Sequence, residues 1–220
     1  MRVADGIVRV EGTRVGNVYL STADDGVVIF DTGIPGNTGR ILAALRRLDR
    51  GPGDIRAIVL THWHPDHVGS AAALRRSTGA PVAIGTLDAP VLASHDLPRK
   101  GRRVMRAIIG VFRIRPIDPD LTLRTGDIVG GWEVIDVPGH TAGSIALRRT
   151  DGVVVSGDAL RGDRRGRLRA PDPGLSLDPE RAVASAREIV ALGPTLLLPG
   201  HGAPVRAPLP TDPALDGPAR

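Results

Sequence analysis

The sequence predicts a single α/β domain in which two β-sheets pack face to face and helices cover their outer faces. Two observations support this fold class. A chain of 220 residues, 41% of them hydrophobic, is long enough to bury the core of one domain. Short β-rich runs occur in two successive blocks, and a helical pattern follows each block. Since only 2% of the residues are aromatic, Val, Leu, Ile and Ala are expected to fill most of the core.

The first block of strands lies in the N-terminal third of the chain. Gly, Asn or Asp residues separate three β-rich runs, which are expected to form a strand meander at residues 7–10, 15–20 and 27–30. Asn37 or Thr38 can then cap a helix whose apolar residues recur at helical spacing over residues 41–48. Three further elements are expected, namely a buried strand over Ile55–Leu60, a helix over residues 70–76 and a strand over residues 81–84.

Residues 86–116 interrupt this pattern, because they are basic and carry an apolar patch from Val104 to Phe112. The second block of strands is expected at residues 121–123, 132–137, 144–148 and 153–156. The run Asp178-Pro179-Glu180 predicts the start of a helix that reaches about residue 192, and a last strand follows at residues 195–198. Residues 204–220 are Pro-rich and expected to be disordered, so the domain is expected to span residues 1–203.

Composition and charge exclude several classes of protein. The chain has no cysteine, which excludes disulfides, thiolate metal ligands and a cysteine nucleophile. No apolar run at the N-terminus resembles a signal peptide and no stretch is long enough to span a bilayer, so a cytoplasmic location is expected. The net charge of +5 comes from arginines spread along the chain, which are typical of a solvated surface. We therefore expect no nucleic-acid partner and no membrane partner.

The residues around His62 carry the strongest chemical signal. Three of the six histidines fall within the run His62-x-His64-x-Asp66-His67. In an extended loop, residues two apart point the same way, so His62 and His64 can share one metal ion. Asp66 and His67 then lie on the other side of the turn and can face a second ion. Pro65 stiffens the loop and removes a backbone donor, which suits a tight ligand-bearing turn.

Three further turns each place one ligand-type residue just after an apolar run. Each turn contains glycine, and they are residues 138–141 with His140, residues 156–159 with Asp158 and residues 199–202 with His201. Strand ends of an α/β sheet gather at one rim, where binding residues commonly lie. Together with the first cluster, these turns supply five histidines and two aspartates. That number suits two metal ions sharing a bridging carboxylate.

Five motifs therefore occur in order along the chain, namely Phe30-Asp31-Thr32-Gly33, His62-x-His64-x-Asp66-His67, Gly139-His140-Thr141, Gly157-Asp158 and Gly200-His201. In this order they resemble the motifs of the metallo-β-lactamase superfamily, over residues 5–203. The resemblance implies a four-layer αββα sandwich. It also implies that residues 86–116 cover the substrate site.

The resemblance assigns a role to each candidate ligand. Metal 1 would take His62, His64 and His140, metal 2 would take Asp66, His67 and His201, and Asp158 would bridge both ions. Asp31 resembles the aspartate that orients the histidine loop without binding metal. The implied cofactors are two divalent ions, zinc by default, with iron or manganese also suited to a His/Asp ligand set.

Within the superfamily the sequence looks most like the glyoxalase II-like branch, through residues 61–67 and 138–144. Glyoxalase II carries a C-terminal helical extension that binds glutathione, whereas about twenty residues follow His201, so hydrolysis of a glutathione thioester is not expected. The absence of cysteine and the presence of Asp158 argue against the β-lactamase classes. Quorum-quenching lactonases use an active-site tyrosine, and the only tyrosine here, Tyr19, is expected in an early strand.

The activity implied is hydrolysis of an ester, thioester or lactone carbonyl by a hydroxide that bridges the two metal ions. Asp158 would hold both ions, and Asp66 would bind one ion and take part in proton transfer, so these two are the expected catalytic residues. The expected partner is a small-molecule substrate. Two alternatives stay open, a mononuclear iron persulfide dioxygenase of the same fold and a phosphodiesterase.

Three features outside the ligand set have two interpretations each. The cations of residues 99–106 either attract an anionic substrate or form a solvated face, and the solvated face is preferred. Trp63 either flanks the pocket or packs in the core, and core packing is preferred. His95, the sixth histidine, is expected in a surface loop rather than in contact with substrate.

Overall fold

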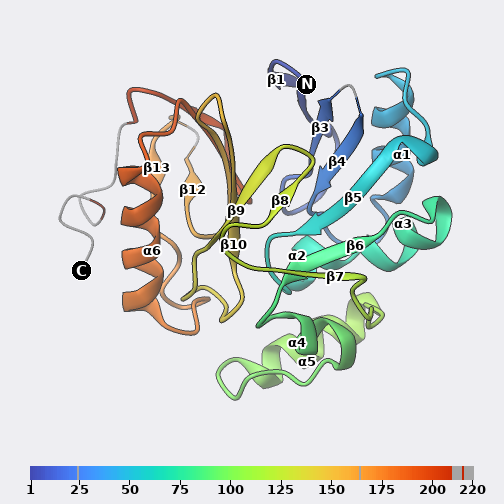
Figure 1. The fold of residues 1–220 in the computed structure, drawn as a ribbon. Helices are drawn as coiled ribbons and strands as arrows, with labels where there is room; N and C mark the ends of the chain where they lie inside the picture. The colour runs from blue at the N-terminus through green and yellow to red at the C-terminus, as the bar shows by residue number, and fades with distance from the viewer. Residues whose placement is uncertain (24, 164, 210–214, 216–220) are drawn as a thin grey trace.

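The computed structural model describes the chain except for residues 24, 164, 210–214 and 216–220. Its helices and strands form four layers in the order helix, sheet, sheet, helix (Figure 1). The predicted αββα sandwich is therefore confirmed.

The strands of the first sheet lie side by side in sequence order. They are β1 (Arg2–Ala4), β2 (Ile7–Arg9), β3 (Tyr19–Ala23), β4 (Gly26–Phe30), β5 (Ile55–Leu60), β6 (Val82–Gly85) and β7 (Leu121–Leu123). The pairs from β1 to β4 are antiparallel and those from β4 to β7 are parallel. The strand expected at residues 15–20 starts only at Tyr19, because Val15 and Gly16 have positive φ angles of 46° and 74°, outside the extended region.

Helices α1 (Thr38–Arg46) and α3 (Ala71–Thr78) cover the outer face of the first sheet (Figure 1). Asn37 is the N-cap residue of α1, one of the two positions that the sequence proposed. A short 3-10 turn, η1 (Pro52–Asp54), precedes β5. The helices α1 and α3, which belong to the connections from β4 to β5 and from β5 to β6, therefore lie on one side of this sheet.

The second sheet has the order β15-β14-β11-β10-β9-β8. Its strands are β8 (Ile128–Val129), β9 (Trp132–Asp136), β10 (Ile145–Arg149), β11 (Val153–Gly157), β14 (Leu196–Pro199) and β15 (Val205–Arg206). Helix α6 (Pro179–Ala191) covers its outer face (Figure 1), and the side chain of Asp178 caps this helix by accepting a hydrogen bond from the Arg181 amide. A separate two-stranded sheet joins β12 (Arg161–Gly162) to β13 (Leu168–Arg169).

Alternating side chains of the central strands build the core in three clusters. Phe30 and Val155 point into the cluster between the two sheets. Ile29, which precedes Phe30 on β4, packs in the cluster shared with α1 and α3. Val154, which precedes Val155 on β11, packs in the cluster under α6. Because successive side chains of a strand point to opposite faces, each sheet has an apolar residue for both of its neighbouring layers.

Residues 86–116 contain two helices, α4 (Ala89–Ser94) and α5 (Arg102–Phe112). Both lie across one end of the sandwich rather than on the outside of a sheet (Figure 1). None of the residues of α5 is buried. None of the helices in the described part of the chain has the length and hydropathy of a membrane span.

The first residues of the tail expected to be disordered are ordered instead. Val205–Arg206 form β15, which pairs with β14. Val205 and Leu215 are buried in the cluster between the second sheet and α6, although the sequence around them is Pro-rich. The remaining part of that prediction, at residues 210–214 and 216–220, lies outside the described residues.

Candidate metal centre

The predicted ligands gather at the end of the sandwich where strands of both sheets terminate. His62 and His64 follow β5, and Asp66 and His67 lie on the short helix α2 (Pro65–Val68). The other three share a position just after a strand, namely His140 after β9, Asp158 after β11 and His201 after β14. Since β11 and β14 are parallel neighbours, their carboxyl ends place Asp158 and His201 side by side.

The loop after β5 differs from the extended conformation that the sequence predicted. His64 is extended, with φ −61° and ψ 146°, but Pro65 starts one turn of helix. Proline is favoured at this first helical position because its φ is already helical and its missing N–H is not needed there. The helical turn is what separates Asp66 and His67 from His62 and His64.

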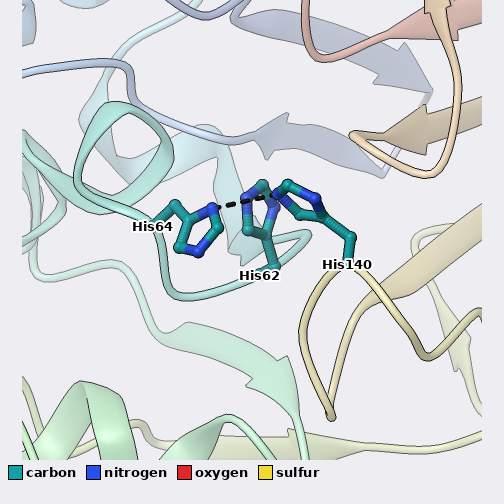
Figure 2. A group of neighbouring side chains, drawn as sticks. All are labelled: His62, His64 and His140. Atoms are coloured by element: carbon teal, nitrogen blue, oxygen red, sulfur yellow. Dashed lines mark hydrogen bonds between the residues drawn. The ribbon is translucent and has the colours of Figure 1, made fainter. Parts of the chain in front are cut away.

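Three histidines form the first group of candidate ligands (Figure 2). One ring nitrogen of each of His62, His64 and His140 lies within 4.8 Å of those of the other two, and all three side chains are buried. Nε2 of His140 is 2.9 Å from Nδ1 of His64. This is the group that the sequence assigned to metal 1.

Asp66, His67 and His201 form the second group, with their ligand atoms also within 4.8 Å of one another. Nε2 of His201 lies 3.1 Å from Oδ2 of Asp66 and 3.3 Å from Nε2 of His67. His67 is fully buried, whereas Asp66 and His201 are partly exposed. This group corresponds to the residues assigned to metal 2.

Asp158 lies between the two groups. Its Oδ1 is 3.3 Å from Nε2 of His67, and its Oδ2 is 3.3 Å from Nε2 of His201 and 3.6 Å from Nε2 of His140. One carboxylate therefore faces histidines of both groups, as a bridging ligand must.

The cluster fits divalent metal ions on two grounds. At a metal–nitrogen distance of about 2.0–2.1 Å, two ligands of a tetrahedral site are about 3.3 Å apart, and the contacts of Asp158 and His201 are close to this value. In addition, Nε2 of His62 and Oδ1 of Asp158 are buried without a hydrogen bond. Buried polar atoms are rarely left without a partner, and a bound cation would supply one.

Burial keeps the first group in the neutral form that binds metal. Burial and the neighbouring imidazoles lower the pKa of His62 far below its ordinary value. Burial, together with His140, lowers the pKa of His64 to about 3, and burial also lowers the pKa of His140. An unprotonated ring nitrogen is therefore available on each residue at neutral pH.

In the second group, neighbouring carboxylates raise the pKa values of the histidines instead of leaving them lowered by burial. Burial alone lowers the pKa of His201, but hydrogen bonds to Asp158 and Asp66 raise it to about 9. Burial likewise opposes the effect of Asp158 and Asp31 on His67, whose pKa is raised well above its ordinary value. The carboxylates of Asp31, Asp66 and Asp158 thus attract positive charge to this group, and a divalent cation competes with these protons.

Asp31 and Asp88 form hydrogen bonds with the loops that carry the candidate ligands. Oδ2 of Asp31 is 2.8 Å from Nδ1 of His67, as expected for the aspartate that orients the histidine loop. Asp88 was not singled out from the sequence. Its carboxylate accepts hydrogen bonds from the amide of Trp63, the hydroxyl of Thr141 and the amide of Gly143, so it joins the loop after β5 to the loop that carries His140.

The turn that carries His201 has supports that the sequence analysis also missed. The hydroxyl of Tyr19 donates to the carbonyl of Pro199 at 2.9 Å, and Nδ2 of Asn17 donates to the same oxygen at 2.8 Å. Burial raises the pKa of Tyr19. The only tyrosine of the chain therefore supports the turn that carries His201 and lies outside the cavity lining. Its position at the start of β3 agrees with the early strand predicted for it.

A cavity of about 410 Å³ opens above the metal centre. Five of the candidate ligands reach its wall, and most of the other lining residues are apolar, among them Ile34, Met105, Ile108 and Phe112. Helix α5 thus contributes its apolar face to the cavity. The cations of residues 99–106 are absent from the described lining, which favours the solvated face.

The remaining two sequence predictions concern Trp63 and His95. Trp63 is buried in the cluster on the helix side of the first sheet, as predicted. His95 is the C-cap residue of α4 and begins the loop that follows this helix, and it lies outside the groups of candidate metal ligands found among the described residues. It belongs to the segment that covers the site and not to the metal centre.

The four-layer fold and the buried histidine–aspartate cluster define a metal-binding protein. Residues 12–201 match the family model of the metallo-β-lactamase superfamily, and the chain belongs to this superfamily. The resemblance noted in the sequence is thus confirmed.

The chain is similar to several members of the superfamily along much of its length. It is 29% identical to the probable metallo-hydrolase YflN of Bacillus subtilis over 87% of this chain and 82% of that protein. It is 38% identical to a hydroxyacylglutathione hydrolase of Cereibacter sphaeroides, over 66% of this chain and 47% of that protein. Among solved structures, TTHA1623 in a di-iron-bound form aligns with a TM-score of 0.68 and 28% identity, over 92% of this chain and 94% of that chain.

Proposed function

We propose that the protein is a dinuclear metal-dependent hydrolase of an ester, thioester or lactone carbonyl. The observation that carries this proposal is the position of Asp158, whose two oxygens face histidines of both ligand groups. The relatives of the chain support hydrolysis and two metal ions, since they include a probable metallo-hydrolase and a di-iron-bound protein. Zinc is the proposed metal because the set is rich in histidine, and iron or manganese also suit it.

In this proposal His62, His64 and His140 hold one ion, Asp66, His67 and His201 hold the other, and Asp158 holds both. The ions would lower the pKa of a water molecule enough to supply hydroxide near neutral pH and would polarise the substrate carbonyl. Asp158 fixes the separation of the two ligand groups. Asp66, which is partly exposed at the cavity, would take part in proton transfer.

A carbonyl substrate is favoured over a phosphodiester by the cavity wall. A nucleic acid requires several cations along its backbone, but Arg161 is the only cationic side chain in the described lining, and it pairs with Asp172 at 3.3 Å. Apolar side chains instead suit the hydrocarbon part of an acyl compound.

The experiment combines metal analysis with a substrate panel. Purified protein is reconstituted with zinc, iron or manganese, freed of excess metal and assayed for metal content. Each form is then tested on short-chain esters, thioesters, lactones, β-lactams, phosphodiesters and a persulfide with oxygen uptake recorded. We expect two ions per chain and turnover of at least one acyl substrate.

Three results would reject the proposal. One is salt-sensitive cleavage of a phosphodiester without activity on any acyl compound. The second is a single iron per chain with oxygen uptake on the persulfide. The third is full acyl activity with one ion per chain, which would retain the substrate class and remove the dinuclear mechanism.

A further inference from the structure

The mouth of the cavity above the metal centre has an apolar rim that is open to solvent. Val15, Phe112 and Leu175 all line this cavity, and they are exposed by 59%, 43% and 54%. These residues come from three distant parts of the chain. Large apolar side chains exposed singly are common, but three around one opening are typical of an interaction site.

Helix α5 extends the apolar surface away from the rim. Val104 and Val111 are exposed by 62% and 79%, and they lie seven residues apart, on the same side of the helix. Ile108, between them in sequence, lines the cavity. The apolar stripe of α5 therefore runs from solvent into the cavity, and no described part of the chain buries it.

The same segment is strongly basic. Residues 97–117 contain seven Arg or Lys residues and no Asp or Glu. Five of these cations are exposed arginines, namely Arg99, Arg103, Arg106, Arg113 and Arg115. The sixth, Lys100, is tied to the loop of Leu175, because its Nζ donates to the carbonyl of Ser176. The apolar rim and the cations thus belong to one connected surface.

We propose that this surface docks on an anionic lipid membrane, with the cavity mouth turned toward the lipid. The docking face consists of Val15, Val104, Val111, Phe112, Leu175 and the five exposed arginines of residues 97–117. Exposed apolar side chains beside arginines are the combination by which peripheral proteins bind acidic head groups and the outer part of the acyl region. The inference rests on the proposed function in one respect: the substrate would be a lipophilic acyl compound that enters the cavity from the membrane.

Charge and composition disfavour the other occupants. A second copy of the chain would bring two surfaces together that each carry arginines and lack acids over residues 97–117, and like charges repel. A nucleic acid would neutralise the arginines but would leave the apolar side chains of the face exposed. An anionic lipid surface would both neutralise the arginines and cover the apolar side chains. This proposal departs from the sequence-based expectation of no membrane partner, because only the fold brings Val15 and Leu175 beside Phe112.

The test is binding of the metal-loaded protein to sedimenting vesicles, either of phosphatidylcholine alone or of phosphatidylcholine mixed with phosphatidylglycerol. We expect binding to the mixed vesicles that weakens as salt is added, and little binding to phosphatidylcholine alone. Replacing both arginines in Arg103→Gln/Arg106→Gln should weaken binding about 25-fold, since each juxtamembrane cation contributes about fivefold in affinity. Val104→Asn/Val111→Asn should abolish binding without changing charge.

Matched controls come from surfaces away from the cavity. Ile128 on β8 is 66% exposed, so Ile128→Asn tests the loss of an exposed apolar side chain elsewhere. Arg76 and Arg124 are exposed on α3 and after β7, so Arg76→Gln/Arg124→Gln tests the loss of two cations. Both controls should bind mixed vesicles like the unaltered protein. Hydrolysis of a short, water-soluble ester should be the same in all variants, since Val104 and Val111 do not line the cavity.

The proposal is overturned if mixed vesicles do not bind the protein, or if the docking-face and control variants bind alike. It is also overturned if the protein self-associates without binding vesicles and Val104→Asn/Val111→Asn makes it monomeric, because the face is then an interface between two copies. Vesicle binding is measured without turnover. A protein that binds vesicles but hydrolyses no acyl compound would therefore reject the proposed function and retain the docking face.

Discussion

Asp31 holds the Nδ1 atom of His67 at 2.8 Å, while Nε2 of the same ring faces Asp158 at 3.3 Å. The Asp31 carboxylate also accepts hydrogen bonds from the amide and the hydroxyl of Thr61. With Asp31 as acceptor, the ring proton is placed on Nδ1 and the lone pair of Nε2 is left for a metal ion. One residue outside the ligand set therefore fixes both the tautomer of His67 and the start of the ligand loop.

This relationship predicts that Asp31→Asn lowers metal affinity by roughly 10–100-fold, the usual effect of removing such a support. Asn is the appropriate substitution because Asp31 has a φ of 58°, which Asn tolerates and Ala does not. The affinity is measured by competition with a chelator. Asp5→Asn, in an exposed ion pair with Arg2, serves as the control and should leave the affinity unchanged. Equal affinities in the two variants would show that Asp31 does not orient His67.

The second prediction concerns Asp158 and His95. Because the oxygens of Asp158 face both ligand groups, Asp158→Ala should reduce metal content from two ions toward none and abolish turnover, with an unchanged circular dichroism spectrum. His95→Asn should keep both ions, since His95 lies outside those groups, and Asn tolerates its φ of 56°. Elemental analysis after gel filtration measures both variants. Retention of one full ion by Asp158→Ala would contradict the bridging role.

The sequence predicted the candidate metal ligands better than the residues that hydrogen-bond to the ligand loops, because only the ligands follow a local pattern. His140, Asp158 and His201 each follow an apolar run and a glycine, as with Asp158 after Gly157, and the other four ligands lie close together after the apolar run Ile55–Leu60, so strand propensity and turn chemistry mark their places. Asp88 has no such mark. It is recognisable only in the folded chain, where it accepts hydrogen bonds from Trp63 and from Gly143, 55 residues further along the sequence.

The start of β3 and the residues around the cavity mouth could not be predicted from a local sequence pattern either. Val15 belongs to a β-rich run, but its positive φ removes it from the strand and leaves it exposed at the cavity mouth. β-propensity describes how well a side chain fits a sheet and does not specify where the backbone turns. The order of layers was predictable because the alternation of buried residues is a local property, whereas the gathering of Val15, Phe112 and Leu175 around one cavity depends on the complete fold.

The third prediction uses the raised pKa of Asp88. Burial raises this pKa to about 6, although hydrogen bonds from Thr141, Gly143 and Trp63 oppose the effect. A carboxyl with a raised folded pKa favours folding below its unfolded pKa of about 3.9, and this contribution is lost as pH rises through about 6. Asp88→Asn cannot ionise but loses the oxygen that accepts hydrogen bonds from Thr141 and Trp63. The variant should therefore be less stable than the unaltered protein at pH 4, and the difference should shrink between pH 4 and pH 7.

The measurement is urea unfolding of both metal-free proteins across this range, where the change in the difference should not exceed about 3 kcal/mol, the equivalent of a shift of about two pKa units. Metal affinity provides the second readout, because Asp88 joins the loop of His62 to that of His140. Asp88→Asn should weaken metal binding at pH 7, whereas Asp136→Asn, on the exposed end of β9, should not. A stability difference independent of pH would show that Asp88 does not titrate in this range.

The last prediction concerns Gly200, the residue before His201. A Cβ atom at this position would collide with Oδ1 of Asp158 and would lie 2.7 Å from Cε1 of His67. Close packing leaves no room for a methyl group unless the carboxylate of Asp158 moves. Gly200→Ala should therefore lower metal content and turnover together. Gly39→Ala is the matched control, because a Cβ on Gly39 in α1 meets nothing within 4 Å, and alanine stabilises a helix by about 0.5–1 kcal/mol relative to glycine. Metal analysis and thermal unfolding distinguish the two variants, and a Gly200→Ala protein with two ions and full activity would show that the carboxylate of Asp158 is free to move.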